Sequence, residues 1–232
     1  MDNLNVLEAE AVEQVETEQF VDEHVAAENK VEFIEKPVYD FFKRVFDVAC
    51  SFLALVVLSP VFLIVSVVIV INDFGNPFFI QERIGKNNKA FRIMKFRSMY
   101  KDAEQRKAAL MSQNEYTDVH FKIEKDPRIT KVGHIIRKTS IDELPQLINI
   151  LKGDMSIIGP RPFIRSEQEQ LPSDRLLVKP GLSCYWQISD TAKMTNDEQL
   201  ELDYRYIRER SFATDIKLIF KTVAVVFTGK NS

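Results

Sequence analysis

The sequence predicts a mainly helical α+β protein that is embedded in a membrane from one side. Three observations lead to this fold class. An uncharged apolar run extends over Val48–Ile71, several later segments have helical periodicity, and two short extended segments flank a turn at Gly85–Lys89. The chain has 232 residues, of which 45% are hydrophobic and 28% charged. This composition excludes both a wholly disordered chain and a channel built from many membrane helices.

The N-terminal segment is acidic, and the rest of the chain is basic. Residues 1–36 carry eleven Asp and Glu against two Lys, a net charge of −9, so the remainder carries +6 within a total of −3. We expect residues 1–36 to be a disordered or protein-binding tail, and not a cleaved signal peptide, because the start has no apolar stretch. Residues 37–232 are then the membrane-embedded domain, whose positive charge suits phosphate-bearing ligands or an anionic membrane face.

The apolar run has more than one interpretation. A straight helix over Val48–Ile71 would be about 36 Å long, enough to span a hydrocarbon core of about 30 Å. Two features favour instead a re-entrant helix-break-helix over about residues 44–72. Ser59-Pro60 lies at its centre, where the proline removes a helical hydrogen bond and the serine hydroxyl can bond a freed carbonyl. Both flanks are basic, and basic flanks prefer the cytoplasmic side. A spanning helix and the buried hairpin of a soluble protein remain as alternatives.

The segments after the apolar run alternate between turns, strands and helices. After a turn at Asn72–Pro77, Pro77–Glu82 and Ala90–Phe96 are predicted to form a hairpin. Helices are predicted over Tyr100–Gln113, Glu143–Leu151, Phe163–Leu177 with an interruption near Pro172, Asn196–Arg210 and Phe212–Phe227. The last helix has an apolar face beside Lys217 and Lys221, which fits an interfacial amphipathic helix and a core-facing helix equally well.

Two adjacent carboxylates, Asp142 and Glu143, lie within a cation-rich stretch. The simple interpretation is a capping box formed by Ser140 and Glu143. The functional interpretation adds the cations around them, which include Arg137 before the pair and Arg161 in a rigid turn after it. Carboxylates and guanidinium groups together can hold a divalent cation and a diphosphate, and a carboxylate that attacks phosphorus would divide a phosphoryl transfer into two displacements.

Other candidates carry weaker signals. Lys95 and Arg97 belong to the stretch Lys95–Met99, which follows a predicted strand and provides either phosphate contacts or an interfacial basic patch. The segment Pro180–Gln187 contains the one tryptophan, which either stacks on a ligand or lies at the membrane interface. The two cysteines, Cys50 and Cys184, suggest no disulfide framework, and the histidines have no metal-ligand spacing.

Six blocks of the sequence, in order, resemble the bacterial sugar transferase family of monotopic phosphoglycosyl transferases. They are RVFDVACSFLALVVLSP, QERIGKNNKAFRIMKFRSM, DPRITKVGHIIRKTSIDELPQL, LKGDMSIIGPRP, KPGLSCYWQ and ELDYRYIRERSFATDIKLIFKT. The resemblance extends from about Phe41 to Thr228 and leaves residues 1–36 outside. It is to the small form of the family, which lacks the additional membrane helices and nucleotide-binding-like domain of the larger members.

The resemblance implies a reaction and its location. Such enzymes transfer a phospho-sugar from a UDP-sugar to polyprenyl (undecaprenyl) phosphate and release UMP. They act at the cytoplasmic face of the bacterial inner membrane and initiate glycoconjugate synthesis, such as that of exopolysaccharide, capsule, O-antigen or glycoprotein. The roles implied for this chain are a covalent nucleophile at Asp142, a Mg²⁺ site at Asp142 and Glu143, phosphate contacts at Arg137 and Arg161, and a re-entrant break at Ser59-Pro60. Homo-oligomers are compatible with the sequence, and no nucleic-acid partner is expected.

The chain departs from the family pattern near its tryptophan. Cys184 stands where relatives usually have glycine, and Asp190-Thr191 stands where they often have a Gly-Arg pair. That arginine contacts substrate in relatives, so its role is either vacant or taken by Lys193, and sugar preference and rate are in doubt. The alternatives are a catalytically weak scaffold of a glycan-assembly complex, direct in-line transfer with Asp142 only binding Mg²⁺, and a bitopic receptor.

Overall fold

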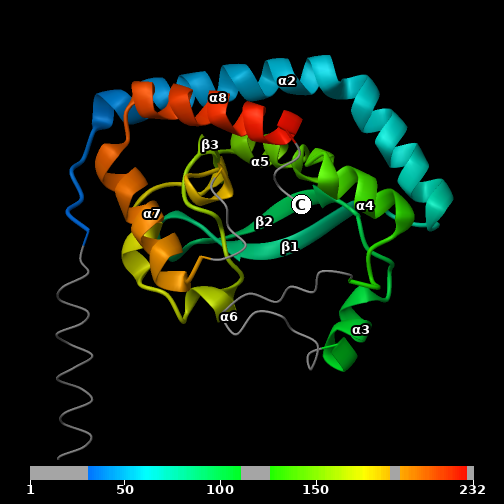
Figure 1. Cartoon of the computed structure of the whole chain (residues 1–232). Coiled ribbons are helices and arrows are strands. Elements are labelled where there is room, and N and C mark those ends of the chain that lie inside the picture. Colours follow the sequence, from blue (N-terminus) through cyan, green and yellow to red (C-terminus); the bar gives the residue numbers. More distant parts are fainter. Residues whose placement is uncertain (1–30, 111–125, 189–193, 229–232) are drawn as a thin grey trace, which may run out of the picture. The chain divides into compact units, whose positions relative to one another are not determined.

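The longest element is α2, a helix of 36 residues over Pro37–Asn72 in a computed structural model that describes residues 31–110, 126–188 and 194–228 (Figure 1). Pro37 occupies the first turn, where a missing N–H costs nothing. Pro60 lies inside the helix, which is bent and not interrupted (Figure 1). The carbonyl of Val56, which faces the missing N–H, accepts a hydrogen bond of 2.8 Å from the Ser59 hydroxyl. The predicted break is therefore a bend in a continuous helix.

The predicted hairpin is confirmed. Strand β1 (Phe78–Ile84) pairs antiparallel with β2 (Ala90–Phe96), in a register that runs from Phe78 opposite Phe96 to Ile84 opposite Ala90. The connection contains a short 3₁₀ turn, η1 (Lys86–Asn88), in which both asparagines have positive φ. Asparagine tolerates this left-handed conformation better than most residues, so the turn closes without glycine at these positions.

A second, parallel pair of strands was not predicted. Strand β3 (Ser156–Ile158) pairs with β4 (Gly181–Ser183). The two backbones approach very closely beside this pair, because a Cβ atom on Gly159 would lie 2.3 Å from the Lys179 carbonyl oxygen, and one on Gly181 would lie 2.1 Å from the Gly159 nitrogen. Only glycine fits at these two positions.

The remaining elements are mostly short helices. In chain order they are α3 (Ala103–Leu110), α4 (Lys131–Lys138), η3 (Ile141–Glu143), α5 (Gln146–Lys152), α6 (Arg165–Gln168), η4 (Ser173–Leu177), η5 (Trp186–Ile188), α7 (Asn196–Glu209) and α8 (Phe212–Thr228). The last two helices confirm the predictions closely. The helix predicted over Phe163–Leu177 is instead the short pair α6 and η4, and the one predicted over Glu143–Leu151 begins only at Gln146. The predicted end of α3 lies outside the described residues.

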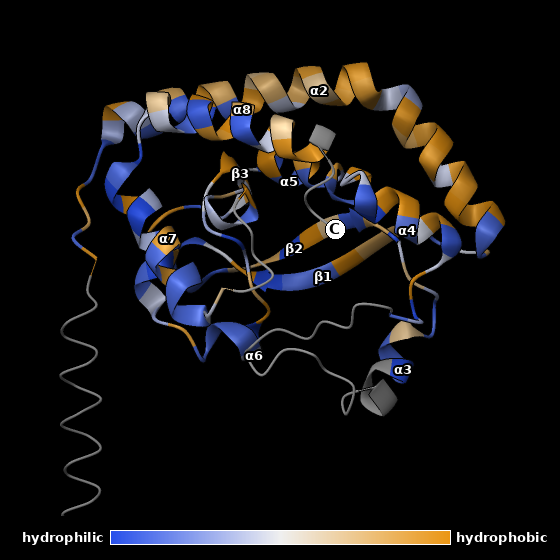
Figure 2. Ribbon diagram, in the orientation of Figure 1, coloured by the Kyte–Doolittle hydropathy of each residue, from blue (hydrophilic) through white to orange (hydrophobic). Residues whose placement is uncertain are grey.

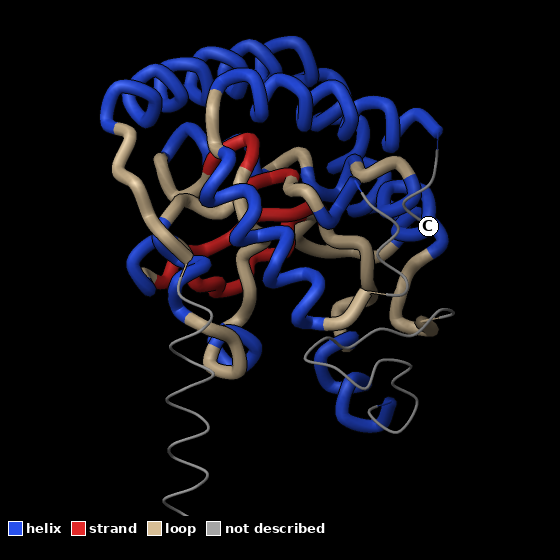
Figure 3. The backbone as a smooth tube through the Cα atoms, turned by 60° about the vertical axis from the view of Figure 1, so that its left-hand side comes forward, coloured by secondary structure: helices blue, strands red, loops and turns tan. Residues whose placement is uncertain are grey.

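Helix α2 has one packed face and one open face. Figure 3 shows the strands in the middle of the unit formed by Phe33–Ser232, with α2 and α8 along one side. Ala54 and Leu55 of α2 pack against a core cluster on α5 and β2, and Ile69 packs against Phe96 and Ile136. The other face is apolar and exposed, as the colouring of Figure 2 shows. Its exposed members include Phe52, Leu53, Val56, Val57, Leu63, Ile64, Val67 and Ile71.

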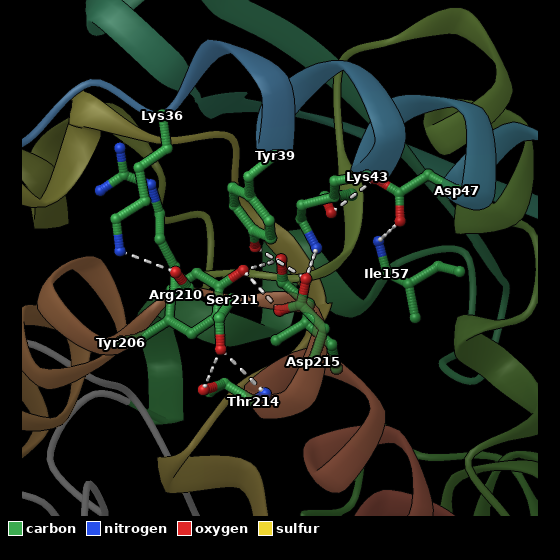
Figure 4. A network of polar contacts seen from close by, with 12 residues as sticks. Lys36, Tyr39, Lys43, Asp47, Ile157, Tyr206, Arg210, Ser211, Thr214 and Asp215 are labelled. Carbon is green, nitrogen blue, oxygen red and sulfur yellow. Dashed lines mark hydrogen bonds and ion pairs between the residues drawn. The ribbon is translucent and has the colours of Figure 1, made fainter.

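The first half of α2 is fastened to the body by polar side chains four residues apart. Tyr39 donates a hydrogen bond of 2.7 Å to the Asp215 carboxylate of α8, and Lys43 forms an ion pair of 2.8 Å with the same carboxylate (Figure 4). Asp215 is buried and also accepts a hydrogen bond of 3.0 Å from the Tyr206 hydroxyl of α7. One carboxylate therefore joins α2, α7 and α8.

Asp47 continues this polar row one turn further along α2. It is buried, and it accepts hydrogen bonds from the Ser156 hydroxyl (2.7 Å) and the Ile157 N–H (3.2 Å) of β3 (Figure 4). We call Tyr39, Lys43 and Asp47 the anchor row. Because each member is paired with a partner in the body, the anchor row fixes the orientation of α2 against the strands.

Candidate active site

The two adjacent carboxylates lie in η3, a single 3₁₀ turn between α4 and α5. The preceding residue, Ser140, has φ 54° and ψ 16°, a left-handed conformation that is unusual for a residue other than glycine. Its side chain makes no capping hydrogen bond, so the capping box considered from the sequence is not formed. Strained backbone of this kind is concentrated at functional sites, and here it brings Asp142 and Glu143 towards the hairpin.

Glu143 is paired with a cation from the hairpin. Lys95 Nζ of β2 lies 2.7 Å from Glu143 Oε1, and both side chains are about one-fifth exposed. Burial acts to raise the pKa of the Glu143 carboxyl, but the charges of Lys95 and Arg161 outweigh it and lower this pKa below its ordinary value. Glu143 is therefore held as a carboxylate.

The pKa of Asp142 is shifted in the opposite direction to that of Glu143. Burial, together with the neighbouring charge of Glu143, raises the pKa of the Asp142 carboxyl from 3.8 to about 6, although Lys95, Arg137 and Arg161 oppose the rise. The ionised form of Asp142 still predominates at pH 7. An ionised but poorly solvated carboxylate among cations is typical of a reactive group rather than of a surface charge.

Two arginines reach the carboxylates from different elements. Arg137 comes from the last turn of α4, and its Nε donates a hydrogen bond of 2.8 Å to the Ser98 hydroxyl. Helix α4 lies directly on this segment, because a Cβ atom on Gly133 would be only 1.9 Å from the Ser98 carbonyl oxygen. Arg161 comes from the rigid turn after β3, with its guanidinium carbon 5.3 Å from the centre of the Trp186 ring. Both guanidinium charges act on the Asp142 carboxyl and oppose the rise in its pKa, which indicates that Arg137 and Arg161 lie near it.

The turn that carries Arg161 is supported from behind by Arg175. This arginine is fully buried and donates a hydrogen bond of 2.6 Å to the Arg161 carbonyl oxygen. It also forms an ion pair of 2.8 Å with Asp203 of α7, and its guanidinium lies over the Phe163 ring. Arg175 therefore acts as a structural brace for the turn and not as a ligand contact.

A pocket opens beside the carboxylates. Its polar lining consists of Arg83, Lys95, Glu143, Gln146, Arg161 and Gln187. Sequence reasoning identified Lys95, Glu143 and Arg161 but missed the other three. Arg83 and Gln187 stand within the family-like stretches QERIG and CYWQ, which was the available signal. Gln146 was missed because a buried amide on an otherwise apolar helix has no distinctive pattern.

Two predicted contacts lie elsewhere or outside the described residues. Arg97 turns towards the end of α2, where it bonds the Asp73 carbonyl and lies 3.6 Å from the Asp73 carboxylate. Its proposed phosphate contact stays a prediction. Lys193 and the Asp190-Thr191 pair lie outside the described residues.

The donor set for a metal ion is small. Among residues 31–110, 126–188 and 194–228, no three His, Cys, Asp or Glu side chains gather into a metal site. Asp142 and Glu143 supply two neighbouring carboxylates, and Mg²⁺ is commonly bound by one or two carboxylates with substrate phosphates and water completing its shell. The pair therefore fits a Mg²⁺ ion that is shared with a phosphate ligand.

Comparison with known proteins extends over most of the chain. The family described as "Bacterial sugar transferase" matches residues 38–229. The galactosyl transferase CpsE of Streptococcus agalactiae is 46% identical over 193 residues, which cover 81% of this chain and 42% of that protein. The exopolysaccharide production protein ExoY of Sinorhizobium fredii is 37% identical, with 85% and 90% covered. The undecaprenyl-phosphate galactose phosphotransferase of Salmonella typhimurium is 38% identical, with 80% and 40% covered. The chain thus spans less than half of two of these relatives and most of the third.

Proposed function

The chain belongs to the bacterial sugar transferase family, and from this premise we propose that it transfers a phospho-sugar from a UDP-sugar to undecaprenyl phosphate and releases UMP. The names of its relatives support the two substrate classes. One is a galactosyl transferase and another is an undecaprenyl-phosphate galactose phosphotransferase. The name of a third, an exopolysaccharide production protein, supports a role at the start of glycan assembly.

The proposed reaction has two displacements at one phosphorus atom. In the first, an Asp142 oxygen attacks the β-phosphorus of the UDP-sugar, the bond from that phosphorus to the bridging oxygen breaks, and UMP leaves with the electron pair. In the second, a phosphate oxygen of undecaprenyl phosphate attacks the phospho-sugar on Asp142, and the carboxylate is released. The observation that carries this proposal is the position of Asp142, a partly buried carboxyl in the η3 turn next to Glu143, whose pKa is raised to about 6 although Lys95, Arg137 and Arg161 oppose the rise.

The other residues of the site have supporting roles in this scheme. Lys95, Arg137 and Arg161 offset the charge of the diphosphate so that a carboxylate can approach it. Asp142 and Glu143 are the residues that would hold Mg²⁺, which when bound neutralises further phosphate charge. Because Glu143 is kept ionised by Lys95, it stays an acceptor for a cation and does not compete with Asp142 for a proton.

We also propose that α2 is re-entrant and lies at the cytoplasmic face of the inner membrane. The helix is long and apolar enough to cross a membrane. Both of its ends, however, contact the same body. Near its start, Arg44 donates a hydrogen bond of 2.8 Å to the Leu151 carbonyl, and near its end Ile69 is buried against Phe96. A helix that crossed the bilayer would place its two ends on opposite sides of a hydrocarbon core about 30 Å thick, so both ends could not contact a body on one side. Accessibility labelling of single cysteines near residues 36 and 74 should therefore mark both from the cytoplasmic side, and opposite sides would refute this topology.

The proposed reaction is tested by Asp142→Asn in the full chain, reconstituted in lipid. Wild type incubated with a panel of radiolabelled UDP-sugars, without undecaprenyl phosphate, should release UMP once per molecule and retain label on the protein. Asp142→Asn should do neither, whereas the matched control Asp102→Asn, an exposed aspartate paired with Arg106, should behave as wild type. Undiminished UMP release from Asp142→Asn would refute the nucleophile. Release that requires the acceptor and leaves no label on the protein would indicate direct in-line transfer.

A further inference from the structure

The pocket lining contains an arginine that the proposed reaction does not yet use. Arg83, on β1, lines the same pocket as Arg161, Lys95 and Glu143. Its guanidinium is poorly satisfied by the protein. One nitrogen bonds the Gln81 side chain at 2.7 Å, another makes long contacts of 3.4 Å with Glu167 and the Pro162 carbonyl, and within the described part of the chain the buried Nε has no hydrogen-bond partner.

This arrangement has an energetic cost in the absence of a ligand. Burial and the nearby charge of Arg161 together lower the pKa of Arg83 to about 10. Two like charges facing one pocket, with a donor left unpaired, are stabilised when an anion enters between them. The pocket lining has three cations against the single carboxylate of Glu143, so it carries an excess of positive charge.

The position of Arg83 relative to Asp142 indicates which phosphate it serves. Arg83 lines the pocket together with Lys95, Glu143 and Arg161, whereas Asp142 is not among the residues that line it. In an in-line displacement the leaving oxygen departs on the side opposite the attacking oxygen. The leaving phosphate should therefore lie away from Asp142, on the side of the pocket that Arg83 lines, with Arg161 between the two phosphates.

We infer that Arg83, together with Arg161, forms the subsite for the phosphate of the departing nucleotide. This inference rests on the proposed function, because it assigns the leaving phosphate of that reaction. Arg83 then contacts the α-phosphate of the UDP-sugar and holds the UMP product. It stabilises the negative charge that develops on the leaving group as the bond to the β-phosphorus breaks.

The test is equilibrium binding of UMP to the full chain in lipid nanodiscs. Arg83→Gln should weaken UMP binding by about 10- to 100-fold, the range expected for a lost charge-assisted hydrogen bond. Arg83→Lys should give a smaller loss, because an ammonium keeps the charge without the fork of the guanidinium. The matched control Arg205→Gln removes an exposed arginine paired with Glu209 and should leave UMP affinity unchanged.

A second variant separates contact from scaffolding. Glu167→Gln removes the ion-pair partner of Arg83 but leaves its guanidinium in place, so UMP affinity should be kept or increased. A loss as large as that of Arg83→Gln would show that Arg83 acts only by holding the fold, and would overturn the inference. Equal UMP affinity of Arg83→Gln and wild type would also overturn the inference. In that case the proposed function would still stand, provided that wild type releases UMP from a UDP-sugar. A wild type that neither binds UMP nor releases it from UDP-sugars would overturn both.

Discussion

Asp142→Asn is expected to stabilise the protein while it removes the proposed nucleophile. The carboxyl is partly buried beside the charge of Glu143, and these two effects raise its pKa from 3.8 to about 6. A tenfold change in a proton-binding constant is worth about 1.4 kcal/mol. The folded state therefore carries a penalty of up to about 3 kcal/mol for keeping Asp142 ionised, and an amide of the same shape does not carry it.

The sign of this effect depends on pH. Because the folded-state pKa lies above the ordinary value, protonated Asp142 favours the folded state. That contribution is fully present below a pH of about 4 and is lost as the pH rises through 6. Asn stays neutral throughout. The gain in free energy of unfolding should therefore be small at pH 4 and should reach about 3 kcal/mol at pH 8.

The measurement is thermal unfolding of the full chain in one fixed lipid or detergent between pH 4 and pH 8. For a chain of this size, 3 kcal/mol corresponds to a rise of about 6 to 12 °C in Tm at pH 8. Asp102→Asn is the control, because that aspartate is exposed and should give no pH-dependent gain. No stabilisation by Asp142→Asn at pH 8, or the same stabilisation at both pH values, would refute the electrostatic reasoning.

Two further predictions concern how the site and the anchor row are built. Gly133→Ala should destabilise the fold by about 1–3 kcal/mol and slow UMP release, because the new Cβ would meet the Ser98 carbonyl at 1.9 Å and displace α4 with Arg137; unfolding and rate measurements that match wild type would contradict this. Asp215→Ala should lower the free energy of unfolding by about 3 kcal/mol, because it leaves the largely buried Lys43 without its ion-pair partner and Tyr39 without its acceptor. A loss below about 1 kcal/mol in chemical denaturation would show that the anchor row contributes little.

The elements that the sequence predicted well are those specified by local patterns. The hairpin follows from two extended segments around the Gly85–Lys89 turn, and α7 from its helical pattern; in the structure α7 begins with a capping box formed by Thr195 and Glu198. The β3–β4 pair escaped prediction because each strand has three residues, too few for a period, and the pairing depends on close backbone approach at Gly159 and Gly181. A break at Ser59-Pro60 was expected, whereas the helix continues through Pro60 with a bend, and the Ser59 hydroxyl bonds the Val56 carbonyl there.

The candidate site was predictable in its composition and not in its geometry. The acidic and basic residue types near Asp142 suggest phosphate chemistry, but by themselves they are also compatible with helix capping and surface charge. The ion pair between Glu143 and Lys95 joins residues that are 48 positions apart, and a contact so distant in sequence cannot be predicted from local patterns. The capping-box alternative was wrong because Ser140 adopts a left-handed backbone conformation, which cannot be predicted from the presence of a serine. Arg83 was not identified as a site residue from the sequence, because its neighbours Pro162 and Glu167 are about 80 positions away along the chain.

The one-sided packing of α2 has a kinetic consequence under the proposed topology. Helix α2 packs against the domain that contains the pocket. If α2 stays in the membrane, the pocket cannot leave the bilayer surface to search for a substrate. It meets a membrane-borne acceptor by lateral diffusion in two dimensions, and the quantity that sets the encounter rate is then the mole fraction of acceptor in the lipid. Adding inert lipid at a fixed amount of acceptor should slow turnover by dilution within the surface, even though the concentration per volume of solution has not changed.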